Sequence, residues 1–157
     1  MMKAMTRVNA PLDALIENAI NFKVRALWDK VLYDFRVFEM TSDRTASRVY
    51  YSFKSPMGVT DRDFYLQQLV RYDSPRPGCV SMHISSLPPD DGEMPQIPKR
   101  VRATMHIVGF IMEPKVDAVT REDYCDVFML TSVDINGLVP KWIVNMGSSS
   151  VPRSWFK

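Results

Sequence analysis

The sequence predicts an α+β fold in which a curved antiparallel β-sheet wraps around a C-terminal α-helix. Apolar residues first follow a helical period, then alternate through six strand-like segments, and finally return to a helical period. Most linkers between the strand-like segments are short, which favours an antiparallel meander. Two of those segments are apolar on both faces, as expected for a sheet that a helix covers or that encloses a cavity.

Two amphipathic helices are expected ahead of the sheet. Residues 9–20 have Pro11 at an early helical position and an apolar stripe made of Leu12, Leu15, Ile16, Ala19 and Ile20. A shorter helix after the polar Asn21 and Lys23 repeats that spacing with Val24, Leu27, Trp28 and Val31. One face of each helix must therefore be buried.

Six strand-like segments follow, each bounded by turn residues: 34–41, 48–54, 62–72, 79–87, 101–112 and 126–134. The linkers include residues 55–58, residues 74–78 and a long proline-rich loop over residues 88–98. The segments 101–112 and 126–134 are the two that are apolar on both faces. An internal apolar cavity would explain that pattern as well as a covering helix does.

The last predicted element is a helix over residues 139–146. Pro140 stands near its start, and large apolar side chains share one face: Val139, Trp142, Ile143 and Met146. An antiparallel sheet buries such a helix most economically by curving around it.

Composition limits the class of protein. The chain has 157 residues, of which 46% are hydrophobic and 24% charged, which fits one domain over residues 1–157. The net charge is +2, and the basic residues are scattered except at Lys99, Arg100 and Arg102, which argues against nucleic-acid binding and leaves a weak attraction to anionic membranes. Cys79 and Cys125 have no metal-ligand spacing, and no apolar run is long enough to span a bilayer. We therefore expect a soluble protein of the cytoplasm.

No catalytic or metal centre is expected from the residues. The serines at 148–150 lack the G-x-S-x-G pattern of a nucleophile elbow. Asp61 and Asp63 flank Arg62, and such alternating charge most simply solvates the start of a strand. His83 lies on the polar face of its strand, and neither it nor His106 belongs to a metal-ligand cluster.

Two polar residues stand out because they lie on apolar strands. Gln68 shares a predicted face with Phe64, Leu66 and Val70, so it is either an edge residue that reaches water, a core amide bonded to a neighbouring strand, or a ligand contact. His106 is surrounded by apolar residues of segment 105–110, where a polar ring needs a partner inside the protein or in a cavity. Together they suggest a ligand with a polar end and an apolar body.

The order of several motifs resembles that of the START family, the domains related to steroidogenic acute regulatory protein that transfer lipids. Arg25, Trp28 and Asp29 form an R-x-x-W-D pattern after the second helix. Lys54 and Pro56 followed by Arg62, Asp63 and Phe64 resemble the family's K-x-P and R-D-F stretches. Residues 101–103, VRA, and residues 136–145, NGLVPKWIVN, match a strand opening and the entry to the last helix. The resemblance covers nearly all of the chain.

The resemblance implies the helix-grip fold, with one lipid enclosed between the curved sheet and the last helix. It is nearest to the phosphatidylcholine-transfer branch, through residues 127–129 and 147–157. Family members begin with a further helix and two strands, so this chain is similar to a truncated or reduced member, with residues 1–8 on an open sheet margin where another copy could pair. A loop with Pro56, Met57, Gly58 and Val59 is implied as a lid, and the helix that starts at Val139 as a gate.

The resemblance also implies which residues contact the lipid. The full expected set is Arg62, Phe64, Gln68, His106, Met129 and Trp142, with Pro56, Met57, Gly58 and Val139 as lid and gate. Gln68 falls where sterol-binding members have an interior arginine, and the acidic partner of that arginine is missing near Val49 and Tyr50, which speaks against a sterol site. Phe64 and His106 fall where the phosphatidylcholine branch has aromatic residues of a choline cage.

The implied function is non-enzymatic binding of a single lipid, a phospholipid, in an internal hydrophobic cavity and its transfer between membranes. The resemblance implies a transient membrane contact and no cofactor or nucleic acid. One alternative is a regulatory domain of a larger protein that senses the lipid. The other is a cyclase or hydrolase on the same fold, for which His106 is the one obvious acid or base.

Overall fold

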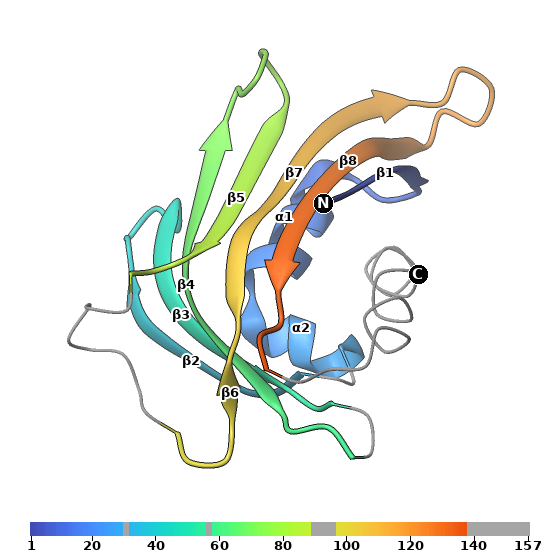
Figure 1. Ribbon diagram of the computed structural model, residues 1–157. Coiled ribbons are helices and arrows are strands. Elements are labelled where there is room, and N and C mark those ends of the chain that lie inside the picture. The colour runs from blue at the N-terminus through green and yellow to red at the C-terminus, as the bar shows by residue number, and fades with distance from the viewer. Residues whose placement is uncertain (30–31, 56–57, 89–96, 138–157) are drawn as a thin grey trace.

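The structure, a computed structural model, describes residues 1–29, 32–55, 58–88 and 97–137. Within them, eight strands form one sheet in the order β1-β8-β7-β5-β4-β3-β2, and β6 pairs with β4. All pairings are antiparallel except the parallel one between β4 and β6. The sheet curves around two helices (Figure 1). The predicted α+β class and curved antiparallel sheet are therefore confirmed.

The strands are Met2–Val8 (β1), Leu32–Met40 (β2), Ala46–Phe53 (β3), Arg62–Tyr72 (β4), Val80–Ser86 (β5), Val101–Arg102 (β6), Thr104–Val116 (β7) and Asp123–Asp134 (β8). The helices are Leu12–Ile20 (α1) and Phe22–Trp28 (α2). The six predicted strands are all present, and segment 101–112 is divided at Ala103 into β6 and β7. The structure adds β1, which pairs with β8 at the margin of the sheet. The predicted helix 139–146 lies outside the described residues.

Both described helices form where the apolar spacing predicts them. The stripe of α1 buries Ile16 and Ile20 against the core, and Leu12, Leu15 and Ala19 pack beside them. The side chain of Asn21 then accepts hydrogen bonds from the backbone N–H groups of Lys23 and Val24, which satisfies two free donors at the start of α2. The chain therefore turns into a second helix within one residue of the first.

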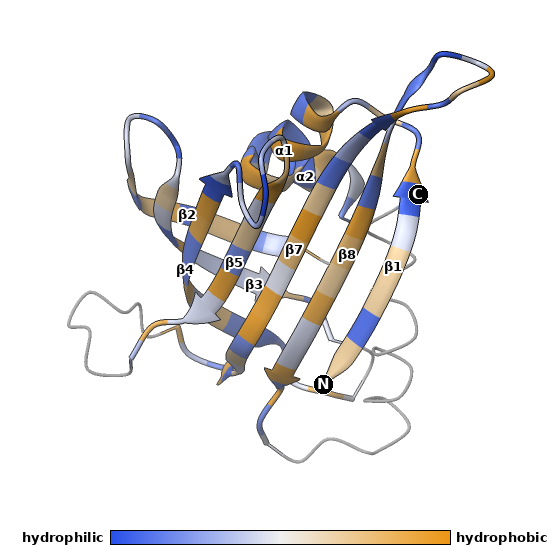
Figure 2. Cartoon of the chain, turned by 90° about the horizontal axis from the view of Figure 1, so that it is seen from above, coloured by the Kyte–Doolittle hydropathy of each residue, from blue (hydrophilic) through white to orange (hydrophobic). Residues whose placement is uncertain are grey.

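The inner face of the sheet carries the main core. Along β4, Phe64, Leu66, Gln68 and Val70 alternate with residues of the outer face, and β8 presents Cys125, Val127 and Met129 in the same way. Figure 2 shows the alternation as bands of hydropathy along the strands. The inner face therefore pairs an apolar surface with a single buried amide on β4.

The segment that leaves β8 is tied to the start of β4 and to β6. The Arg62 guanidinium donates to the carbonyl oxygens of Ile135 (3.0 Å) and Asn136 (2.8 Å), and also to that of Thr60. Asn136 in turn donates from Nδ2 to the carbonyl oxygen of Arg102 at 3.0 Å. These bonds fix the path of the chain up to Gly137.

Candidate functional site

Gln68 is the buried polar residue at the middle of the inner face. Its side chain is 3% exposed, and the Tyr51 hydroxyl on the neighbouring strand donates to its Oε1 at 3.4 Å. Within the described part of the chain, its Nε2 donates no hydrogen bond. The prediction of an edge residue reaching water is therefore wrong, and a core amide bonded across strands, with an amide N–H pair left for a further acceptor, fits.

A buried ion pair on α2 lies beside this amide and was not singled out from the sequence as a site. Arg25 donates from Nε and Nη2 to Asp29 Oδ2, both at 3.1 Å, and the side chains are 5% and 8% exposed. Their i, i+4 spacing brings them together on one face of the helix. A buried pair of this kind is costly to desolvate, which makes a stabilising role alone a weak explanation.

Tyr51 joins the ion pair to Gln68. The Arg25 Cζ atom lies 4.9 Å from the centre of the Tyr51 ring, and the ring's hydroxyl bonds to Gln68. Burial raises the pKa of Tyr51 to about 12, although the nearby Arg25 charge lowers it. The hydroxyl therefore stays protonated and remains a donor at physiological pH. Asp29, Arg25, Tyr51 and Gln68 form what we call the interior polar chain.

Aromatic rings surround the interior polar chain. Phe53 packs edge-on against Phe64 at 5.7 Å and against Tyr51 at 6.1 Å between ring centres. The Arg25 Cζ atom also lies 5.9 Å from the Phe53 ring centre. Within the described residues, the cation beside the Tyr51 and Phe53 rings is thus the protein's own guanidinium. A quaternary ammonium group would have to share the rings with it.

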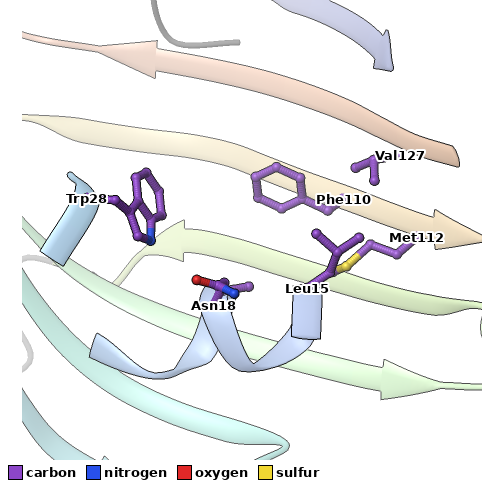
Figure 3. A pocket seen from close by; sticks show the side chains of 7 residues that line it. Leu15, Asn18, Trp28, Phe110, Met112 and Val127 are labelled. Carbon is purple, nitrogen blue, oxygen red and sulfur yellow. The ribbon is translucent and has the colours of Figure 1, made fainter. Parts of the chain in front are cut away.

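A small apolar cavity lies between the helices and the strands β7 and β8. Its volume is about 50 Å³, and Leu15, Asn18, Ala19, Trp28, Phe110, Met112 and Val127 line it. Figure 3 shows the side chains of Trp28, Phe110 and Leu15 converging on this space. A site for a drug-sized ligand needs roughly 300 Å³ or more. This cavity by itself is therefore too small to hold a lipid.

Asn18 is the polar residue of this cavity wall. Its Nδ2 donates to the carbonyl oxygen of Ala14 at 2.8 Å, one turn back along α1. That bond fixes the amide beside the apolar side chains Leu15 and Ala19. The sequence held a signal for it, because Asn18 lies three residues after Leu15 and directly before Ala19 of the predicted apolar stripe.

The fold brings only some of the predicted lipid-contacting residues together on the inner face. Phe64, Gln68 and Met129 lie buried on the inner face, each at 6% exposure or less. Arg62 is buried too, but its guanidinium bonds to backbone carbonyls of the β8 exit segment. Gly58 is exposed with a φ of 86°. Pro56, Met57, Val139 and Trp142 lie outside the described residues. The lipid-binding and lid roles of this whole set remain predictions.

His106 is exposed, so its predicted interior position is wrong. The pairing of β7 with β8 shifts register between Met105 and Ile107, which is the mark of a bulge. Met105 packs against the core and Val108 is buried, so the bulge absorbs one residue and leaves His106 outside. His106 is therefore not positioned as a polar contact, acid or base in the core.

Asp63 also differs from its sequence interpretation. It is 2% exposed and accepts bonds from Arg102 Nε at 2.7 Å and from the Tyr50 hydroxyl at 3.1 Å. It therefore does not solvate the start of β4 but anchors an outer-face network. His83, in contrast, is exposed as predicted.

Comparison with known families and solved structures identifies the family of this chain. The START domain family matches residues 1–155. The chain belongs to the START domain family. No curated protein sequence matches it. Among the described residues, no helix of this START domain is long and apolar enough to cross a bilayer.

Solved structures of START proteins share the fold. The human StarD13 (DLC2) lipid transfer and protein localization domain matches with a TM-score of 0.74 and 22% identity over 99% of this chain and 76% of that one. Human STARD10 matches with a TM-score of 0.76 and 20% identity over 98% of this chain and 61% of that one. A STAR-related lipid transfer protein fragment from Xanthomonas axonopodis matches with a TM-score of 0.66 and 16% identity over 98% of this chain and 78% of that one. These START structures confirm the helix-grip fold.

Proposed function

We propose that this START domain binds one lipid against the inner face of its sheet and transfers it between membranes. The observation that carries the proposal is Gln68, a buried amide on an apolar face whose Nε2 donates to nothing in the described part of the chain. An amide donor beside an apolar face gains free energy when it meets an acceptor, and a lipid oxygen placed there would supply one. The family match and the similarity to the StarD13 domain, whose name includes lipid transfer, support the same function.

The lipid we propose is a phospholipid. Arg25 places a buried guanidinium on the inner face beside the rings of Tyr51 and Phe53, and such a planar cation suits phosphate oxygens. Asp29 already accepts two of its bonds, so the phosphate would add to the ion pair or displace Asp29 from it. The nearest branch would then be the phosphatidylcholine-transfer one, with Phe64 among the rings around the head group.

Selectivity would come from the polar end of the lipid. Burying an acyl chain gains about 0.8 kcal/mol per methylene group relative to water, but almost nothing relative to the bilayer from which the lipid comes. A choice among lipids must therefore rest on head-group contacts, each of about 1 to 3 kcal/mol. Transfer would need a transient contact between this domain and a membrane of the cytoplasm, during which the lid opens.

The test is a vesicle-to-vesicle transfer assay with fluorescent phospholipids of different head groups, comparing wild type with Gln68→Leu. We expect the variant to change the preference among head groups by roughly 5-fold to 100-fold, since one polar contact is worth about 1 to 3 kcal/mol. Gln67→Leu is the matched control, because Gln67 is the next residue of β4 and belongs to the opposite, outer face.

Three outcomes would count against the proposal in different ways. An unchanged lipid preference in Gln68→Leu, or an equal change in Gln67→Leu, removes Gln68 from the head-group site. Lipid binding without transfer between vesicles points instead to a domain that senses the lipid. Absence of any lipid binding by the wild type contradicts the function as a whole.

A further inference from the structure

In the fold, two further cations, Arg36 and Lys54, lie near the basic residues that cluster in the sequence at 99–102. Residues Val101 and Arg102 form β6, which pairs with the start of β4 in the lower part of the sheet in Figure 1. Arg100, just before β6, thereby reaches β2, where its Cζ atom lies 5.1 Å from the centre of the Tyr33 ring. Arg36 on β2 and Lys54 after β3 lie on the same surface, as the following contacts show.

Tyr33 is the exposed centre of this surface. Tyr33 is 55% exposed. Lys54 Nζ lies 5.2 Å from the centre of its ring, and Arg100 Cζ lies 5.1 Å from the same point. The Arg36 Cζ atom lies 5.8 Å from the ring centre of Tyr50 on the neighbouring strand β3. Contacts of this kind hold long cationic side chains in place at a modest gain in free energy.

A network of buried hydrogen bonds holds the Arg100 side chain against the sheet. Asp63 accepts bonds from Arg102 and from the Tyr50 hydroxyl, and Arg100 Nη1 donates to the same hydroxyl at 2.7 Å. These residues belong to the outer face, because Tyr50 and Asp63 alternate along β3 and β4 with the inward Tyr51 and Phe64. The surface is therefore on the opposite side of the sheet from the interior polar chain.

Positive charge exceeds negative charge here among the described residues. The cations are Arg36, Lys54, Arg100 and Arg102, with Lys99 next to Arg100 in the chain, and the carboxylates are Asp34, Asp61 and Asp63. Asp63 is buried, Asp61 accepts a bond from the backbone of Ser55 through Oδ1, and Asp34 lies within 4 Å of both Arg36 and Arg100.

Two of the cations are left with their charge exposed. Lys54 and Lys99 have exposed side chains, and no ion pair to either is found in the part of the chain that the structure describes. Their charge is therefore available to an anion outside the protein.

The position of this surface relates it to lipid exchange. Lys54 directly precedes the connection from β3 to β4, which contains the predicted lid of Pro56, Met57, Gly58 and Val59. A membrane that touches Lys54 and Tyr33 from outside would thus lie next to that loop. Tyrosine suits such an interface, because its ring is apolar and its hydroxyl remains in water.

We propose that Tyr33, Arg36, Lys54, Lys99 and Arg100 form a docking surface, the outer basic patch, for the anionic head groups of a membrane. The proposal rests on the proposed lipid transfer, to which it adds the membrane partner and the face that meets it. A patch of this size neutralises few phosphates, which disfavours a nucleic acid, whereas basic residues beside an anionic bilayer are attracted by its surface potential.

The test measures co-sedimentation of the protein with vesicles of phosphatidylcholine, with and without phosphatidylserine. Lys54→Gln combined with Lys99→Gln removes two exposed charges that form no ion pair among the described residues, and it leaves the buried network intact. Lys3→Gln combined with Arg71→Gln is the matched control, since both side chains are exposed, Lys3 on β1 and Arg71 near the opposite end of β4. Thermal unfolding of both double variants confirms that they are folded.

We expect wild type to bind the anionic vesicles more tightly than the neutral ones, and the Lys54/Lys99 variant to bind them roughly 25-fold more weakly, about fivefold for each charge. The control pair should lose much less, and salt should weaken wild-type binding because the screening length is about 10 Å at 0.1 M. Equal losses in both double variants, equal binding to neutral vesicles, or binding of an acidic peptide in place of vesicles would each overturn the outer basic patch.

A second measurement separates this inference from the proposed function. Lipid retained by the protein after incubation with neutral vesicles reports the interior site and should be the same in wild type and in the Lys54/Lys99 variant. Docking to anionic vesicles without retained lipid would refute lipid transfer and leave the docking surface standing. Retained lipid without preference for anionic vesicles would refute the docking surface alone.

Discussion

At the scale of single residues, several buried side chains have partners from distant parts of the sequence. Gln68 was visible in the sequence because it interrupts an apolar strand face, and it is buried there. The burial of Asp63 was not visible, because its partners Tyr50 and Arg102 are 13 and 39 residues away. His106 was misplaced because alternation alone does not reveal a bulge.

Tyr51 gives a prediction for stability against pH. Its pKa is about 12 in the folded protein and near 10 when exposed, so between those values the unfolded state loses the proton first. The folded state then binds more protons, and stability falls as pH rises, by about 1.4 kcal/mol per pH unit. Below pH 10 this contribution is fully present.

The measurement is urea unfolding of wild type and of Tyr51→Phe at several pH values between about 9 and 12. Other tyrosines and lysines titrate there in both proteins, so the informative quantity is the difference between the two unfolding free energies. We expect that difference to shift against wild type as pH rises. A difference that stays constant over this range would show that the Tyr51 hydroxyl is not held protonated by burial.

At the scale of elements, periodicity located both described helices and six strands, because their apolar faces are set by local spacing. It did not identify β1, which pairs with β8 at the edge of the described sheet, although residues 1–8 were expected on a sheet margin. Periodicity also did not predict that segment 101–112 is divided at Ala103, because the division arises from the pairing of β6 with β4. Pairing across the sheet, rather than local sequence, decides such features.

The exit from β8 gives a prediction for the element that follows it. Gly137 has a φ of 75°, and a Cβ atom there would lie 3.3 Å from Arg62 Nη2. Gly137→Ala should therefore cost about 1 to 2 kcal/mol for the backbone and roughly 1 kcal/mol more for the weakened Arg62 bonds. Chemical denaturation measures the total.

Gly78→Ala provides the control for that substitution. Gly78 has a φ of 80°, but nothing lies within 4 Å of its Cβ position. It should show the backbone cost alone, so Gly137→Ala should be the more destabilising of the two. Equal destabilisation would mean that the Arg62 guanidinium does not hold the exit segment as tightly as its two hydrogen bonds to that segment indicate.

At the scale of the whole molecule, the two faces of the sheet have different chemistry. The inner face is apolar around the interior polar chain, and the lower part of the outer face carries the outer basic patch. The apolar residues on both parities of β8 did not require a cavity on each side, because Phe128 of the outer parity is 38% exposed. The lipid site that we propose lies on the inner face alone.

The most direct test of that site is native mass spectrometry of the purified protein after incubation with liposomes of mixed lipids, followed by extraction and identification of any retained lipid. We predict one retained lipid per chain, a phospholipid, and a changed lipid profile in Gln68→Leu but not in Gln67→Leu. A protein that emerges without lipid from every mixture would contradict a lipid site on the inner face.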